Sequence, residues 1–246
     1  MKKIILLAFI SFFTISCGEL GKVLSTTGGV LEALENGISE EEASSGLKQA
    51  LEFGVNNGTS FLGKTDGFLK NLAYKVLLPE EVRQAEQDIR SIPILGTLAG
   101  QQMDKLITSM NRGAENAMAE AKPIFVSAIK GMTIQDAINI VTGGEGAATA
   151  YLKRVTSAQL QAKFRPVIKT ELDKLNVNDL WTDVSGFYNK ASGKNVTTDL
   201  NDYVTERAMT ALFTEIKKEE DKIRKDPVAR TTDLLKKVFG YADTQK

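Results

Sequence analysis

Apolar residues recur at helical spacing along most of the chain, and this periodicity predicts an all-α protein. The clearest stripe comes late, where Val204, Ala208 and Leu212 follow one another every four residues, the spacing that places side chains on one face of a helix. A longer stripe from Met103 to Ala121 predicts a second long helix, which we expect to kink or break at Pro123. No run alternates apolar and polar residues for long enough to predict a strand.

Shorter helices are predicted wherever the same spacing is bounded by Gly, Pro or a capping residue. Gly58 should interrupt the first of them, and a capping sequence at Thr156 should begin a helix that bends at Pro166. The predicted ranges are about 44–57, 68–76, 80–90, 133–141, 147–152, 156–175 and 228–239. We therefore expect a single irregular domain of about nine or ten helices over residues 44–241, without an internal repeat.

The N-terminus has the pattern of an export signal. Lys2 and Lys3 precede a twelve-residue apolar run, which is too short to span a bilayer. Cys17 is the only cysteine, and its position after this run and before Gly18 resembles a bacterial lipoprotein processing site. We expect residues 1–16 to be a signal peptide, Cys17 to be acylated and residues 17–43 to form the lipidated tether. The alternative is an ordinary signal peptide with a thiol close to its cleavage site.

Composition excludes several classes of function. The chain has 31 basic and 31 acidic residues and a pI near 6.5, so nothing attracts a phosphate backbone and no nucleic-acid partner is expected. The absence of histidine removes the Ser/His/Asp and Cys/His catalytic arrangements and the usual transition-metal ligands. We expect no metal site and no cofactor.

Several separated segments together resemble one known family. These segments are 63–69, 110–115, 121–125, 164–166, 202–204 and 226–235, which include Gly-Lys-Thr-Asp-Gly-Phe-Leu, Met-Asn-Arg-Gly-Ala-Glu and Asp-Pro-Val-Ala-Arg-Thr-Thr-Asp-Leu-Leu. They are similar to the bacterial envelope proteins catalogued as domain of unknown function 4197. The resemblance covers about residues 46–240 and implies one helical domain in the envelope. It carries over no activity, substrate or catalytic residue.

Polar residues of these segments give a candidate ligand site. Asn111, Arg112 and Glu115 lie within two turns of one predicted helix, with Lys122 two turns further on and Arg165 near the Pro166 bend. They could hold a polar head group. The alternative is a set of structural ion pairs, in which Glu115 would neutralise Arg165.

Three further patterns have both a functional and a structural interpretation. The sequence Gly143–Gly146 could present backbone N–H groups to an anion, or simply link two helices. Arg230 could pair with Asp202 or Glu206, among residues that cap helix ends. The larger aromatic residues could line an apolar cavity or pack the core; they are Tyr151, Phe164, Trp181, Phe187, Tyr188 and Phe213.

These observations favour a lipid-anchored protein of the bacterial envelope, in the outer membrane facing the periplasm. The membrane is contacted through the acyl chains on Cys17. We expect a non-catalytic binding or scaffold module for a protein or lipid partner, or for an apolar or acidic small ligand. The alternative is an enzyme that uses a pair of carboxylates, for example on an envelope glycan.

Overall fold

The computed structural model describes residues 38–80, 83, 86–87, 90–91, 95–176, 181–182, 189, 193 and 199–244. Within these residues the fold is all-α, as predicted, with six α-helices, one short 3-10 helix and no strand. The helices are α2 (Glu40–Gly63), α4 (Leu95–Lys130), α5 (Ile134–Thr142), α6 (Ala147–Asp173), α8 (Leu200–Lys225), η1 (Pro227–Ala229) and α9 (Asp233–Thr244). The predicted nine or ten helices are not matched in the described part of the chain. Cys17, the signal peptide and nearly all of the predicted tether lie outside it.

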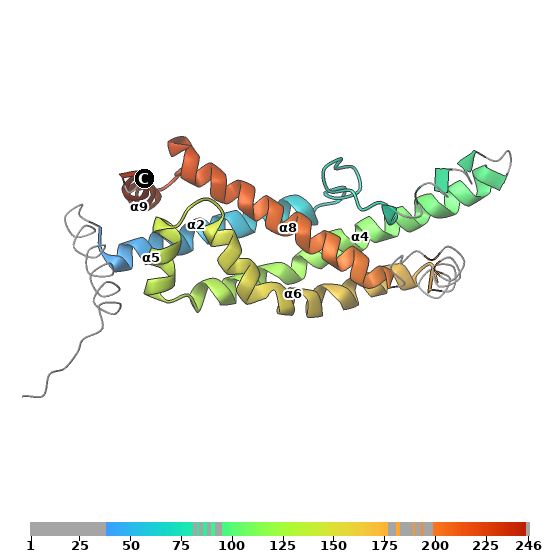
Figure 1. Ribbon diagram of the computed structural model, residues 1–246, viewed down its shortest axis with the longest axis horizontal. Coiled ribbons are helices and arrows are strands. Elements are labelled where there is room, and N and C mark those ends of the chain that lie inside the picture. The colour runs from blue at the N-terminus through green and yellow to red at the C-terminus, as the bar shows by residue number, and fades with distance from the viewer. Residues whose placement is uncertain are drawn as a thin grey trace, which may run out of the picture.

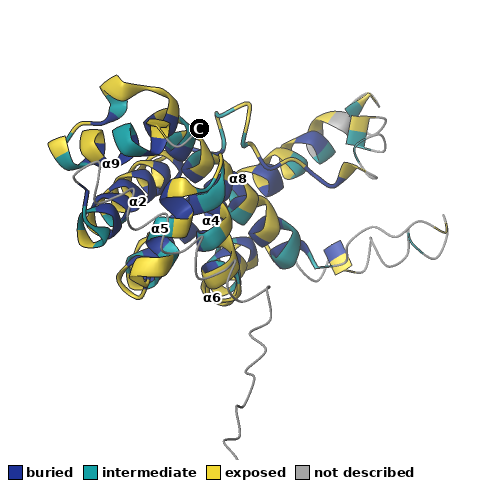
Figure 2. Cartoon of the chain, turned by 60° about the vertical axis from the view of Figure 1, so that its left-hand side comes forward, coloured by how far each residue is buried: buried dark blue, intermediate teal, exposed yellow. Residues whose placement is uncertain are grey.

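The four long helices form a ring in which neighbours pack on one another, and α4 and α8 also contact each other across it. α4 contacts α6, α6 contacts α8, α8 contacts α2, and α2 contacts α4. They run along the long axis of the molecule, while α5 and α9 cover one end and the segment 64–79 projects beside α8 (Figure 1). The apolar stripes of these helices turn toward one another, so the buried positions gather between the helices (Figure 2).

Glycines on α2 allow this helix to approach its neighbours closely. A Cβ atom at Gly46 would lie 2.6 Å from a methyl group of Val238 in α9, and one at Gly58 would lie 3.6 Å from Ile216 in α8. Gly58 therefore lies at the contact between α2 and α8. The prediction that Gly58 interrupts the helix is wrong, because α2 continues to Gly63. The helix also begins four residues before the predicted domain, at Glu40, because Ser39 and Glu42 form a reciprocal capping box.

Two predicted helix breaks are absent, which lowers the helix count. α4 continues through the exposed Pro123, since Ala121 and Phe125 on either side of it are completely buried. One lost backbone hydrogen bond is thus outweighed by packing. Thr156 lies in the middle of α6 and does not begin a helix. Its hydroxyl donates to the carbonyl of Leu152 at 2.7 Å.

The segment predicted as a helix over 68–76 is instead a series of turns. The backbone N–H groups of Phe68, Leu69 and Val76 donate to side chains of α4 rather than to carbonyls four residues earlier. Phe68 and Val76 are nevertheless buried, so the apolar pattern that predicted a helix is used by a turn segment packed on the core. Tertiary hydrogen bonds have replaced the local ones.

Candidate functional site

Three residues of α4 attach the turn segment to the helix ring, and we call Asn111, Arg112 and Glu115 the α4 clamp. The amide of Asn111, which is completely buried, accepts from the Val76 N–H at 2.8 Å and donates to the Val76 carbonyl at 2.8 Å. Its second amide hydrogen donates to the Ile107 carbonyl at 2.7 Å. One side chain thus satisfies both backbone groups of Val76 where the chain leaves the turns.

Glu115 holds the other end of the same segment. One carboxylate oxygen accepts from the N–H groups of Phe68 at 3.0 Å and Leu69 at 3.1 Å, and the other accepts from Arg112 at 2.5 Å. Arg112 also donates to Asp66 at 2.8 Å. Hydrogen bonds from Lys70 and Arg112 lower the pKa of Asp66, and those to Glu115 and Asp66 raise the pKa of Arg112. Asp66 and Arg112 are therefore both charged at neutral pH.

The backbone at this turn explains part of the Gly-Lys-Thr-Asp-Gly motif. Asp66 has a left-handed φ of 67°, which its short side chain tolerates. A Cβ atom at Gly67 would lie 2.3 Å from the Leu62 carbonyl oxygen, so no larger residue fits there. Two of the segments that resemble the family are thus in direct contact, since the 63–69 turn is bound by the Asn-Arg-Gly-Ala-Glu sequence of α4.

The structure brings together Asn111, Arg112 and Glu115, places Lys122 in the same surface depression as Glu115, and separates Arg165 from them. Arg165 does not pair with Glu115, and that prediction is wrong. Arg165 lies 2.5 Å from Asp199 and 2.6 Å from Asp202, because α6 packs against the start of α8. Lys122 is exposed on α4 and has no ion pair with any other described residue, although it shares an open surface depression with Glu115.

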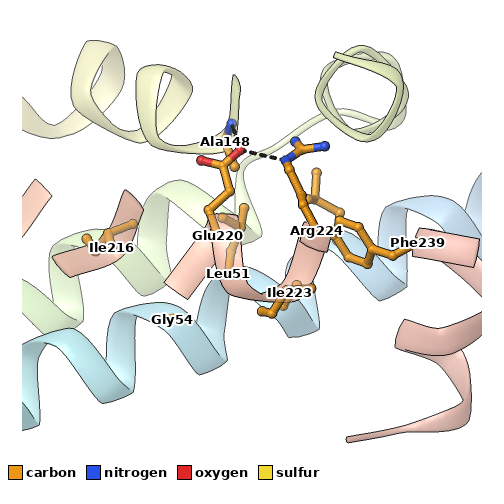
Figure 3. Close-up of a pocket in the computed structure, with 10 residues that line it drawn as sticks. Leu51, Gly54, Ala148, Ile216, Glu220, Ile223, Arg224 and Phe239 are labelled. Carbon is orange, nitrogen blue, oxygen red and sulfur yellow. Dashed lines mark hydrogen bonds and ion pairs between the residues drawn. The ribbon is translucent and has the colours of Figure 1, made fainter. Parts of the chain in front are cut away.

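The helix start that follows the predicted anion site at Gly143–Gly146 is bound by one of the protein's own carboxylates. Glu220 of α8 accepts from the backbone N–H groups of Ala148 at 3.1 Å and Thr149 at 2.9 Å, at the start of α6. Arg224 donates to Glu220 at 2.9 Å and to the carbonyls that end α5 (Figure 3). The adjoining cavity encloses about 20 Å³, enough for one water molecule. This pair is therefore a structural link between α8, α5 and α6.

Two other structural interpretations hold for the described residues. Arg230 pairs with Asp243 at 2.7 Å and donates to the last carbonyls of α8, not to Asp202 or Glu206 as predicted. Most of the candidate aromatic residues pack in the core, where Phe125 meets Phe213 edge to face at 5.9 Å between ring centroids. Phe187 and Tyr188 lie outside the described residues.

An open site lies between the clamped segment and α8, and we call it the Tyr74 groove. It has a volume of about 360 Å³, within the range of small-molecule sites. One wall comes from the turn segment and the residues that follow it, and the other comes from the first half of α8. The lining residues are Ala73, Tyr74, Lys75, Val76, Leu77, Leu78, Glu80, Arg83, Tyr203, Arg207, Thr210, Ala211 and Thr214.

Tyr74 joins the two walls of the groove. Its hydroxyl donates to the Glu215 carboxylate and accepts from Lys218 at 2.6 Å, and Lys218 also lies 2.9 Å from Glu215. Burial and the bond to Glu215 raise the pKa of Tyr74, and bonds to Tyr74 and Glu215 raise the pKa of Lys218. At neutral pH the tyrosine is therefore protonated and the lysine is charged. A second link is the Tyr203 hydroxyl, which donates to the Leu77 carbonyl at 3.0 Å.

The groove carries more positive than negative charge. Its lining includes Lys75, Arg83 and Arg207 but one carboxylate, Glu80, which lies 3.2 Å from Arg83. The Arg207 guanidinium stacks on the Tyr203 ring, 5.2 Å from the centroid, and has no acidic partner among the described residues. The i,i+4 spacing of Tyr203 and Arg207 was a signal for this stack in the sequence. The opposite wall had no such signal, because its residues lie more than 120 positions earlier.

The described residues show neither a metal cluster nor a single membrane-spanning helix. No three Asp, Glu, Cys or His side chains in that part of the chain come together in an arrangement able to hold a metal ion. No single described helix has the length and hydropathy of a membrane span; Ala99–Lys130 and Ile134–Thr142 meet that test together, across a bend of 103°.

The fold and groove define a class: an all-helical protein with an amphiphilic surface groove and a core of four long helices among the described residues. Residues 37–240 match the family model described as protein of unknown function DUF4197. The chain belongs to this family, which confirms the resemblance inferred from its motifs. No curated protein and no solved structure matches the chain.

Proposed function

We propose that the chain is a lipid-anchored protein of the bacterial envelope whose helical body binds a small acidic molecule in the Tyr74 groove. The observation that carries the binding role is the uncompensated cation in the groove. The Arg207 guanidinium lies over the Tyr203 ring, is exposed to solvent and has no carboxylate partner among the described residues. Guanidinium groups in this state suit phosphate or carboxylate groups, which they bind through two parallel hydrogen bonds.

The shape of the groove supports a ligand with both apolar and charged parts. Leu77, Leu78 and Ala211 provide apolar surface, while Lys75 and Arg83 add positive charge near Arg207. The α4 clamp fixes one wall and the Tyr74 hydroxyl joins it to α8, so the groove is formed before a ligand arrives. Such preorganisation lowers the entropic cost of binding.

The protonation states at the groove favour binding over catalysis. Tyr74 keeps its proton and Lys218 keeps its charge, so neither acts as a base near neutral pH. A glycan-cleaving enzyme needs two facing carboxylates about 5 to 10 Å apart. The described lining of the groove contributes only Glu80, which is already paired with Arg83. The geometry therefore gives the enzyme alternative no support.

Anchoring rests on the sequence. Acyl chains on Cys17 would hold the mature protein in the membrane, and Gly18 rather than Asp at the next position favours the outer membrane, with the body in the periplasm. Partners would then come from the envelope, as a lipid or a protein carrying an acidic group.

Native mass spectrometry of the protein isolated from its own envelope tests the binding role. We expect an additional mass on the wild type that is lost in Arg207→Met. Arg154→Met is the matched control, because Arg154 also stacks on a tyrosine of its own helix, Tyr151, at 5.3 Å, but lies outside the groove. An additional mass retained in Arg207→Met, or no bound molecule in any of the three proteins, would refute the proposal.

A further inference from the structure

The turn segment presents one leucine almost entirely to solvent. Leu72 is 98% exposed, more than any other large apolar residue that the structure describes. Leu77, on the same segment, is 40% exposed. We call residues 68–77 the Leu72 loop. Covering a fully exposed leucine with a partner or a membrane lowers the free energy, because apolar surface is removed from water.

The exposure of Leu72 is built into the loop and does not result from a loose chain end. Glu115 holds the backbone of Phe68 and Leu69, and Asn111 holds Val76. Inside the loop, Asn71 organises the turns. Its backbone carbonyl accepts from the N–H groups of residues 74 and 75, and its side-chain oxygen accepts from the backbone N–H of residue 73. With Phe68 and Val76 buried on either side, Leu72 cannot fold back onto the core.

The charges around Leu72 match an anionic surface. Lys70 and Lys75 flank it and are both exposed. Lys70 pairs with Asp66, which Arg112 also binds, and Glu215 is bound by Tyr74 and Lys218, whereas Lys75 has no ion pair with another described residue. Exposed apolar side chains flanked by lysines are typical of segments that bind the interface of an anionic bilayer.

We propose that the Leu72 loop docks on an anionic phospholipid surface, with Leu72 in the interface and Lys70 and Lys75 near the phosphates. The inference rests on the proposed anchoring at Cys17. Ile38 is 21 residues beyond Cys17 (38 − 17), so the connecting chain can reach at most about 75 Å. Because the anchor keeps the body near the membrane, a weak contact between the loop and the lipid surface is sufficient for docking. Tyr74, Lys75 and Leu77 belong to both loop and groove, so docking brings the groove beside lipid head groups.

A polarity-sensitive dye next to Leu72 tests the docking. The mature lipidated chain with Ala73→Cys carries one free thiol, because Cys17 is acylated, and it is reconstituted into vesicles of phosphatidylcholine with phosphatidylglycerol. Gln161→Cys is the matched control, since it is exposed on α6, a helix on the opposite side of the molecule from the loop (Figure 1). Flotation of the vesicles reports anchoring separately from dye emission.

We expect the dye at residue 73 to shift to the blue and to be quenched by nitroxide-labelled lipids, with neither effect at residue 161. Adding Leu72→Asp should abolish both effects while the protein still floats. Flotation without a shift at residue 73, or an equal shift at residue 161, would overturn the docking but leave the anchoring intact. A shift that requires membrane proteins in the vesicles would identify a protein as the occupant and would also overturn it. Loss of flotation in the unsubstituted protein would refute the anchoring instead.

Discussion

Replacing Glu115 by glutamine tests how the Leu72 loop and the groove wall are held. Glu115 is 4% exposed, and its carboxylate is shared among two backbone N–H groups and Arg112. In Glu115→Gln the amide oxygen still accepts from Phe68 and Leu69, but as a neutral group. The amide nitrogen then faces the Arg112 guanidinium, donor against donor.

The loss of stability follows from these contacts. Hydrogen bonds to a charged acceptor contribute about 1.5 to 3 kcal/mol and those to a neutral one about 1, so two weakened bonds cost about 1 to 4 kcal/mol. A buried charge left without any partner costs about 3 to 5 kcal/mol, but Arg112 keeps Asp66 at 2.8 Å. We therefore expect Glu115→Gln to lower the free energy of unfolding by about 2 to 4 kcal/mol.

Urea denaturation of the mutant beside the wild type measures this loss. Glu120→Gln is the control, because it makes the same change on the same helix at a partly exposed residue and should stay within about 0.5 kcal/mol of wild type. Amide exchange at residues 68 and 69 should also accelerate in Glu115→Gln and not in the control. Wild-type stability together with lost ligand binding would refute the clamp and restore Glu115 as a ligand-binding residue.

Other substitutions test the helix packing, the surface ion pairs and the anchor. Gly46→Ala should destabilise by about 1 to 3 kcal/mol in a thermal melt, since its Cβ would lie 2.6 Å from Val238. Gly240→Ala has open space around the added Cβ and should be neutral or stabilising by up to about 1 kcal/mol. Equal effects of the two substitutions would contradict the close packing of α2 on α9. Arg165→Met should cost under about 1 kcal/mol, because its two carboxylate partners are partly exposed. Burial opposes the shift, but bonds from the Asp202 N–H and Arg165 lower the pKa of Asp199, so its contribution to stability is present above the unfolded pKa of about 4 and is lost as the pH falls through the lower folded pKa. Arg165→Met should therefore lose less stability than wild type as the pH falls below about 4, and identical acid unfolding curves would refute this. Cys17→Ser should leave the membrane fraction in a detergent-partitioning assay, and unchanged partitioning would exclude the acyl anchor.

Elements with local signals at both ends could be predicted from the sequence. The predicted 133–141 helix is α5, whose N-cap Thr133 and Asp136 form the expected capping box. The predicted stripe of Val204, Ala208 and Leu212 lies on α8, which spans Leu200–Lys225 and ends just before Asp226 and Pro227. Caps, prolines and glycine ends act over a few residues, so the sequence alone reveals them.

The errors come from interactions between distant residues. Turns replace the helix predicted at 68–76 because Asn111 and Glu115, more than 30 residues later, provide the hydrogen bonds. Pro123 does not end α4, because apolar packing on both sides of it compensates for one missing bond. Of the five predicted site residues, Asn111, Arg112 and Glu115 meet in the structure: Asn111 and Glu115 bind the protein's own backbone, and Arg112 pairs with Glu115 and Asp66. Local periodicity cannot reveal a groove whose walls are Tyr74 and α8.

Amide hydrogen exchange of the ligand-loaded and the solvent-extracted protein tests the central claim most directly. If an acidic molecule binds in the Tyr74 groove, its presence should slow exchange at residues 73–78 and around residues 203–214, on the two walls, and leave α9 unchanged. Arg207→Met isolated in the same way should show the unloaded pattern in both preparations. Protection confined to another part of the molecule, or identical exchange before and after extraction, would contradict the account.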